Sequence, residues 1–294
     1  MFTPLIEGLS FTEAPRWHDG RLWISDMYTH RVLAIGLDGN VETMAEVPQQ
    51  PSGMGWLPDG RLLVVSMRDR RILRREPDGT LEEHADLFAL APWHLNDMVV
   101  DAQGRAYVGN AGFDFMSGAD VTLTHVIRVD PDGSVTVVAD GLGCPNGMVI
   151  TPDGATLVVA ESLCSRLTAF TIDADGALAD RRTWAAFGEP PSTQGLAEAL
   201  AQAEAVPDGI CLDAEGAIWV ADPFHARVLR VAEGGTILEE RQGPMGLFAC
   251  MLGGADGRTL FLCAAPSFHE EESARDHRAA ILMTDVEVPA AGLP

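Results

Sequence analysis

A nearly constant spacing separates four oxygen-bearing side chains from a glycine in a following turn. Counting back seven residues from Gly20 gives Glu13, and counting back eight residues from the later turn glycines gives Asn96, Asn146 and Asp208. Carboxylate and amide oxygens are the donors that hard divalent cations prefer, and two carboxylates in a narrow space repel each other unless a cation lies between them. The spacing therefore predicts a site for one divalent cation, and the absence of His and Cys from the set disfavours a dedicated zinc site.

A simpler interpretation is that Asn146-Gly147 and Asp208-Gly209 merely form turns, as Asn-Gly and Asp-Gly pairs often do. That interpretation accounts for each pair separately. It does not account for the shared eight-residue spacing, or for Glu13 and Asn96. We therefore prefer the cation site.

The elements that would position these residues belong to a repeat. A turn with glycine, followed by a short apolar run, occurs six times and predicts a buried strand each time. The turn glycines are Gly20, Gly60, Gly104, Gly154, Gly216 and Gly257, at spacings of 40, 44, 50, 62 and 41 residues. Further Asp-Gly hairpins between apolar runs extend each unit to a meander of about four strands, which is typical of a β-propeller blade.

We therefore expect an all-β fold: a six-bladed β-propeller with four antiparallel strands per blade, built as one domain over residues 1–294. The sixth unit has little chain after Val288 for a fourth strand, so the segment 3–8 is expected to complete that blade and close the ring. The first strand of each propeller blade lines the central channel. Residues at equivalent positions of these strands would thus face one another.

Charge and composition exclude several classes of protein. The chain of 294 residues has 20 Lys and Arg against 43 Asp and Glu, a formal charge of −23, which disfavours nucleic acid and anionic membrane as partners. No apolar stretch is long enough to span a membrane, and no signal peptide is visible. The five cysteines form no C-x-x-C pair. A cytoplasmic location with reduced thiols is therefore expected. The cysteines are expected to be small buried side chains. The serine-hydrolase, phosphate-loop and dinucleotide motifs are absent, and the oligomeric state stays open.

Four segments together resemble one known family over essentially the whole chain. The segments are EAPRW, HLNDMVVDAQGR, CPNGMVITPDG and VPDGICLDAEGAIWVAD, and the family is that of gluconolactonase, senescence marker protein and luciferin-regenerating enzyme. The resemblance implies a six-bladed propeller with one catalytic divalent metal. It implies Glu13, Asn146 and Asp208 as ligands and Asn96 as a fourth ligand or one that binds through water. Ca2+ is the expected ion, with Mn2+, Mg2+, Fe2+ and Zn2+ as alternatives.

The expected activity is hydrolysis of a small-molecule lactone or ester. The metal would polarise the carbonyl for attack by water, and Asp208 is the predicted base, with a metal-bound hydroxide that needs no base as the alternative. Two other functions stay open: a calcium-binding, regulatory or scaffold propeller without turnover, and a phosphotriester or aryl ester hydrolase on the same metal. Metal-dependent turnover of a lactone would distinguish the first of these from an enzyme.

Substrate contacts are expected around the metal. His94 lies two residues before Asn96, on the same face of a strand, where sugar lactonases of the resembling family often have an arginine. His94 could contact substrate, shuttle a proton or simply bond within the wall. The insertions 109–125 (with Phe113 and Phe115) and 187–207 are either lids or ordinary loops, and as lids they favour a substrate more hydrophobic than gluconolactone. Trp17, Phe248 and Phe268 are further aromatic candidates, with a core position preferred for Trp17, and the charged segment 267–278 is expected to be solvated surface.

Overall fold

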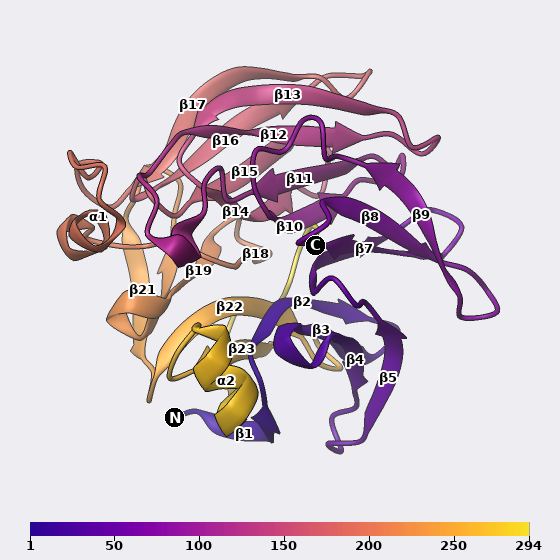
Figure 1. Ribbon diagram of the computed structural model, residues 1–294. Helices are drawn as coiled ribbons and strands as arrows, with labels where there is room; N and C mark the ends of the chain where they lie inside the picture. Colours follow the sequence, from indigo (N-terminus) through magenta and orange to yellow (C-terminus); the bar gives the residue numbers. More distant parts are fainter. Residues whose placement is uncertain (294) are drawn as a thin grey trace.

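Six four-stranded antiparallel sheets surround a common axis in the computed structural model, which describes residues 1–293 (Figure 1). Blade one contains β2 (Thr12–His18), β3 (Arg21–Asp26), β4 (Arg31–Ile35) and β5 (Val41–Glu46). Blade two contains β6 (Pro51–Trp56), β7 (Leu62–Ser66), β8 (Arg71–Arg75) and β9 (Leu81–Asp86). Blade three contains β10 (Leu95–Val100), β11 (Ala106–Asn110), β12 (Thr124–Val129) and β13 (Val135–Leu142).

The second half of the chain repeats the same order. Blade four contains β14 (Pro145–Ile150), β15 (Thr156–Glu161), β16 (Arg166–Ile172) and β17 (Leu178–Ala186). Blade five contains β18 (Ile210–Leu212), β19 (Ile218–Asp222), β20 (Arg227–Val231) and β21 (Ile237–Gln242). Blade six contains β22 (Gly246–Gly253), β23 (Thr259–Ala265), β24 (Ala279–Asp285) and, from the other end of the chain, β1 (Thr3–Leu9).

The predicted ring closure is confirmed. Strand β1 pairs antiparallel with β24, from Thr3 opposite Met283 to Leu9 opposite Ala279, and it forms the outer strand of blade six. The all-β, six-bladed architecture with four strands per blade is therefore as expected from the repeat. Residue 294 of the predicted domain lies outside the described residues.

The turn glycines explain why each unit folds as a hairpin. All six turn glycines adopt positive φ, from 72° to 85°, which a glycine reaches without steric cost. The strands between them bury their apolar residues against neighbouring blades: Trp219 is 1% exposed, and Trp17 stacks on Phe261 with ring centroids 5.5 Å apart. The core position expected for Trp17 is thus confirmed.

Two short α-helices, three single-turn 3-10 helices (Met27–Thr29, Phe115–Ser117 and Pro223–His225) and a C-terminal segment complete the described chain. Helix α1 (Leu196–Gln202) lies in the insertion between blades four and five, and α2 (Glu270–Asp276) lies between β23 and β24. After β24 the chain crosses to the inner strands, where Ala290 bridges to Asp213 and Leu293 to Ile150, and this last described segment runs into the ring in Figure 1. In the described chain no helix is long and apolar enough to cross a membrane.

Candidate active site

The inner strands carry a β-bulge where the predicted ligands lie. Between the pairs Leu95–Asn110 and Met98–Val108, strand β10 has one residue more than its partner, and β14 repeats this around Asn146. A bulge inserts an unpaired residue and redirects its side chain. The side chains of Asn96 and Asn146 are therefore turned toward the axis by the same irregularity of the backbone.

Strand pairing refines the register of the fourth residue. Asn96, Asn146 and Asp208 each lie two residues before the residue that pairs with a valine of the second strand. In blade one the residue that pairs at the corresponding position is Arg16, opposite Trp23. Glu13 lies three residues before Arg16, so the residue that corresponds to Asn96 by strand register is Ala14. Ala14 has a φ of 49°, a left-handed conformation within the bulge. Glu13 nevertheless lines the same cavity as the other three residues.

The glycines after two of these residues are packing residues rather than turn residues. Gly147 lies inside β14 and is not among the glycines with positive φ. A Cβ atom at Gly147 would lie 2.6 Å from the carbonyl oxygen of Asp208, and one at Gly209 would lie 2.4 Å from the Cβ of Ala249. These contacts are too close for any side chain. The glycines thus allow the inner strands of blades four, five and six to converge, and the turn interpretation of both pairs is wrong.

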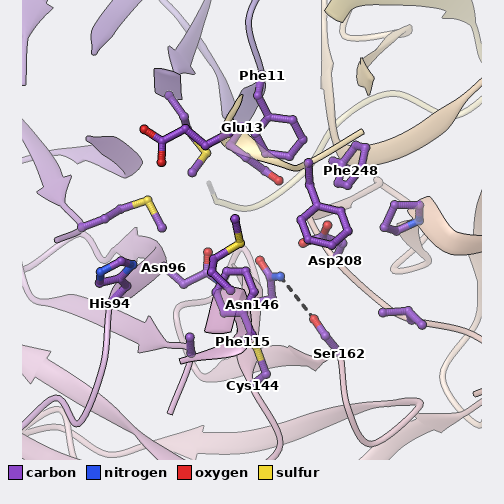
Figure 2. Close-up of a pocket in the computed structure, with 18 of the residues that line it drawn as sticks. Phe11, Glu13, His94, Asn96, Phe115, Cys144, Asn146, Ser162, Asp208 and Phe248 are labelled. Carbon is purple, nitrogen blue, oxygen red and sulfur yellow. Dashed lines mark hydrogen bonds between the residues drawn. The ribbon is translucent and has the colours of Figure 1, made fainter. Parts of the chain in front are cut away.

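All four predicted oxygen donors line one cavity at the axis, together with His94, Phe113 and Phe115 (Figure 2). Asp208 is 7% exposed, and within the described residues its buried Oδ1 atom has no hydrogen-bond partner. A buried carboxylate oxygen without a partner is costly unless something outside the protein binds it.

The charges around this cavity do not balance. Glu13, Asp97 and Asp208 interact electrostatically, and the arginine that acts on Glu13 and Asp97 is Arg16. Arg16 is already committed, since it forms an ion pair of 2.6 Å with Asp97 and donates to three backbone carbonyls. When all three carboxylates are ionised, a charge of about −2 is left uncompensated, which one divalent cation would neutralise.

This imbalance shifts the proton affinity of the carboxylates. Burial, with a further contribution from Asp97, raises the pKa of Glu13 to about 8. Burial, together with the charge of Glu13, raises the pKa of Asp208 well above its usual range. Burial also raises the pKa of Asp97, although Arg16 opposes this shift. Without a cation, the cavity therefore favours protons on Glu13 and Asp208.

The orientation of the Asn146 amide follows from its neighbour. Ser162 Oγ donates its single proton to the carbonyl oxygen of Pro207 at 2.7 Å, so it can only accept from Asn146. The Asn146 group directed to Ser162, at 3.2 Å, must therefore be the Nδ2 amide (Figure 2). This leaves the Oδ1 atom of Asn146 available to the cavity. The sequence contained no signal for Ser162.

These residues fit a divalent cation as a set of oxygen donors. In residues 1–293 no three Asp, Glu, His or Cys side chains form a metal cluster, so a four-donor set exists only if the two amides contribute. The unpartnered Oδ1 of Asp208, the uncompensated charge and the orientation of Asn146 each favour a cation bound among Glu13, Asn96, Asn146 and Asp208.

His94 lies at one side of the cavity as a partly buried ring stacked on Trp93, with centroids 4.9 Å apart. Burial, followed by the charge of Arg68, lowers the pKa of His94, which favours the neutral imidazole. Within the described chain, no hydrogen bond of protein groups involves its ring nitrogens or the side chain of Asn96. Both side chains are therefore free to contact a bound molecule.

The two insertions contact each other and cover the same cavity. The backbone amide of Val121 donates to the carbonyl of Gln194 at 2.7 Å, which joins the two segments. Phe113, Phe115 and Met116 line the cavity from one segment, and Leu196 and Leu200 of α1 line it from the other. Both insertions thus roof the candidate site rather than lying elsewhere on the rim.

The charged segment 267–278 is largely solvated, as expected, but part of it is helical and part of it reaches the site. It contains α2 instead of forming a loop, and Phe268 and Glu270 line the cavity. Arg68 of blade two forms an ion pair with Glu270 and donates from Nε to Gln50 Oε1 at 2.8 Å. These contacts join distant parts of the chain, so no local pattern could have indicated them.

Cys144 also differs from the expectation of a buried structural cysteine. It is partly exposed and lines the cavity, whereas the other four cysteines are buried. Burial in the channel, followed by the charge of Asp208, raises the pKa of the Cys144 thiol to about 12. Because the thiolate is the nucleophilic form, Cys144 is not suited to attack a substrate.

Fold and site together define a class: a closed six-bladed propeller with carboxylate and amide oxygens gathered on its axis. Residues 11–266 match the family described as the SMP-30/Gluconolactonase/LRE-like region, and the chain belongs to this family.

Named relatives extend over nearly the whole chain. A pentonolactonase, XacC, from Haloferax volcanii is 28% identical over 93% of this chain and 90% of its own length. A 6-deoxy-6-sulfogluconolactonase from Pseudomonas putida is 26% identical over 96% of this chain and 93% of its own length. The solved structure of a calcium-binding protein, regucalcin, from Agrobacterium tumefaciens has the same fold, with a TM-score of 0.77, 21% identity, and coverage of 99% of this chain and 94% of that one.

Proposed function

We propose that this protein hydrolyses a lactone or a related carboxylic ester with the help of one divalent cation held by Glu13, Asn96, Asn146 and Asp208. The observation that carries the proposal is that the partly buried Glu13 and the buried Asp208 share one cavity, with no arginine or lysine of the described chain paired with either. The lactonase names of two relatives support the reaction, and the calcium-binding regucalcin supports Ca2+ as the ion.

When bound, the cation would polarise the carbonyl of the substrate and stabilise negative charge on its oxygen. Water adds its oxygen to the carbonyl carbon, and the ring C–O bond breaks. One proton of the water passes to the ring oxygen, which becomes a hydroxyl, and the other is released from the new acid group. Asp208 is assigned as the base that accepts the proton of the attacking water, since a carboxylate has two oxygens and can use one for binding and the other for the proton.

The other residues orient the reactants. Ser162 fixes the Asn146 amide so that its oxygen faces the cavity. Asn96 and His94 have no partners of their own among the described residues and are assigned to contact the substrate. Phe113 and Phe115 lie over the cavity and exclude bulk water from it.

The test is metal-dependent turnover. The protein is stripped with a chelator, supplied with one divalent ion at a time, and assayed for acid release from lactones and aryl esters. We expect turnover only with a divalent ion, and a loss of at least 100-fold in Asp208→Asn, the usual range for removing a general base. Asp213→Asn is the matched control. Asp213 directly follows β18, the strand that Asp208 precedes, and its carboxylate pairs with Arg230 away from the cavity.

Three results would contradict the proposal or part of it. Full turnover after complete removal of metal would exclude the cation from the reaction. Cation binding without turnover of any lactone or ester would favour a calcium-binding protein instead. Turnover retained in Asp208→Asn with cation bound would remove Asp208 as the base.

A further inference from the structure

Most of the side chains that line the cavity are apolar, and this apolar part of the lining is called the wall. Its side chains come from separate parts of the chain, among them blade one, the insertion in blade three, helix α1, and blades five and six. The apolar lining residues include Phe11, Phe113, Phe115, Leu196, Leu200 and Phe248. Such a wall gains free energy by removing apolar surface of a ligand from water.

Three polar side chains of the cavity lining, Tyr28, Ser162 and Gln50, already have partners. The Tyr28 hydroxyl donates to the carbonyl of Phe268, and Ser162 donates to Pro207. Gln50 Oε1 accepts from Arg68. Apart from His94, Asn96 and the Nε2 amide of Gln50, a polyhydroxylated ligand would find few groups in the described lining free to replace the water lost from its hydroxyls, and a buried hydroxyl without a partner opposes binding.

The wall also lacks a free positive charge. In the part of the chain that the structure describes, Arg68 is the one arginine or lysine that lines the cavity. Its charge is paired with Glu270, which lines the same cavity and whose side chain is 41% exposed. A lactone with a phosphate, sulfonate or carboxylate group would therefore meet the carboxylate of Glu270 and no unpaired arginine or lysine of the described lining.

We propose that the substrate is an uncharged lactone with an apolar substituent, bound with its ring carbonyl at the oxygen donors and its substituent between Phe113–Met116 and α1. The inference rests on the proposed lactone hydrolysis and names its substrate class. The hydrogen bond between Val121 and Gln194 joins the two segments that would enclose the substituent. Phe115 and Leu200 are the specificity-determining residues.

The experiment uses δ-valerolactone and its 6-alkyl derivatives with methyl, propyl and pentyl chains, beside δ-gluconolactone. We expect kcat/KM to rise by up to about fourfold per methylene, the factor that corresponds to burying one CH2 group, and δ-gluconolactone to fall below the pentyl lactone. Leu200→Asn should reduce the ratio of pentyl to unsubstituted kcat/KM by about tenfold, since the substituent would face an amide. Leu238→Asn is the control, because Leu238 is an exposed leucine on β21 outside the cavity.

The outcomes separate this inference from the proposed function. Turnover that is fastest on δ-gluconolactone, or that does not change along the alkyl series, overturns the substrate class and leaves the lactonase proposal standing. If no lactone is hydrolysed, the lactonase proposal fails, and the wall is tested by calorimetric binding of 6-pentyl-δ-lactam against δ-valerolactam. Tighter binding of the pentyl lactam supports the apolar subsite, and equal binding overturns it.

Discussion

In chelator-treated protein, folding stability should fall as pH rises, because Glu13 binds its proton more tightly in the folded chain. Its pKa is raised from 4.5 to about 8. Between these values the folded state holds a proton that the unfolded state has lost, so each rise in pH favours unfolding. The contribution is fully present below pH 4.5 and is lost as pH rises through about 8.

The magnitude has a ceiling. One proton changes the free energy of unfolding by about 1.36 kcal/mol per pH unit, which gives at most about 5 kcal/mol across this window. The partly exposed surface of Glu13 and its interaction with Asp208 reduce that figure. For a chain of this size each kcal/mol shifts the Tm by roughly 2 °C, so a fall of several degrees is expected.

The assay is thermal unfolding of chelator-treated protein from pH 5 to 8, compared with the Glu13→Gln variant. The difference between wild type and variant isolates the titration of this residue, and Glu46→Gln, on the exposed edge of blade one, controls for loss of a surface carboxylate. Added Ca2+ should restore the Tm most strongly at high pH, where no proton has to be displaced. A wild-type curve parallel to that of Glu13→Gln, with or without Ca2+, would refute the reasoning.

Three further outcomes are expected. Ser162→Ala should weaken cation affinity about 10- to 100-fold in a calcium titration, because it releases the side chain of Asn146. Ser165→Ala is the control, since it removes a similar buried hydrogen bond to a backbone carbonyl, and it should leave the affinity unchanged. Equal effects of the two variants would contradict the role of Ser162. Gly147→Ala should cost about 1–3 kcal/mol in urea unfolding, since its Cβ would meet the backbone of blade five, and a neutral effect would contradict the close packing. Deleting residues 1–9 should lower the Tm far more than trimming a free terminus, because blade six loses its outer strand; an unchanged Tm would argue against ring closure.

The parts of this structure that local sequence encodes were predictable. The turn glycines indicated the hairpins, and the missing strand of blade six led to β1. The eight-residue spacing also identified Asn96, Asn146 and Asp208 as equivalent positions.

Other parts depend on contacts that no local pattern records. In blade one the bulge with the left-handed Ala14 places Glu13 one residue earlier in the strand register than Asn96, Asn146 and Asp208. Counting residues back from the turn glycine cannot show this difference. Arg16 forms an ion pair with Asp97, which lies 81 residues away in the sequence, and Arg68 forms one with Glu270, which lies 202 residues away. These pairs decide the charge balance and the shape of the cavity mouth, yet they exist only once the blades are assembled.

The pairing of β1 with β24 also has a consequence for synthesis on the ribosome. Thr3 and Met283 are partners 280 residues apart, so β1 leaves the ribosome long before its partner is made. During that interval its backbone groups form an unpaired edge, which can join other chains. Forming such a distant contact is slow, and we expect closure of blade six to be a late step of folding. A nascent chain that ends before residue 279 has no strand to cover that edge, so incomplete products of this gene should be more prone to aggregation than their length alone would suggest.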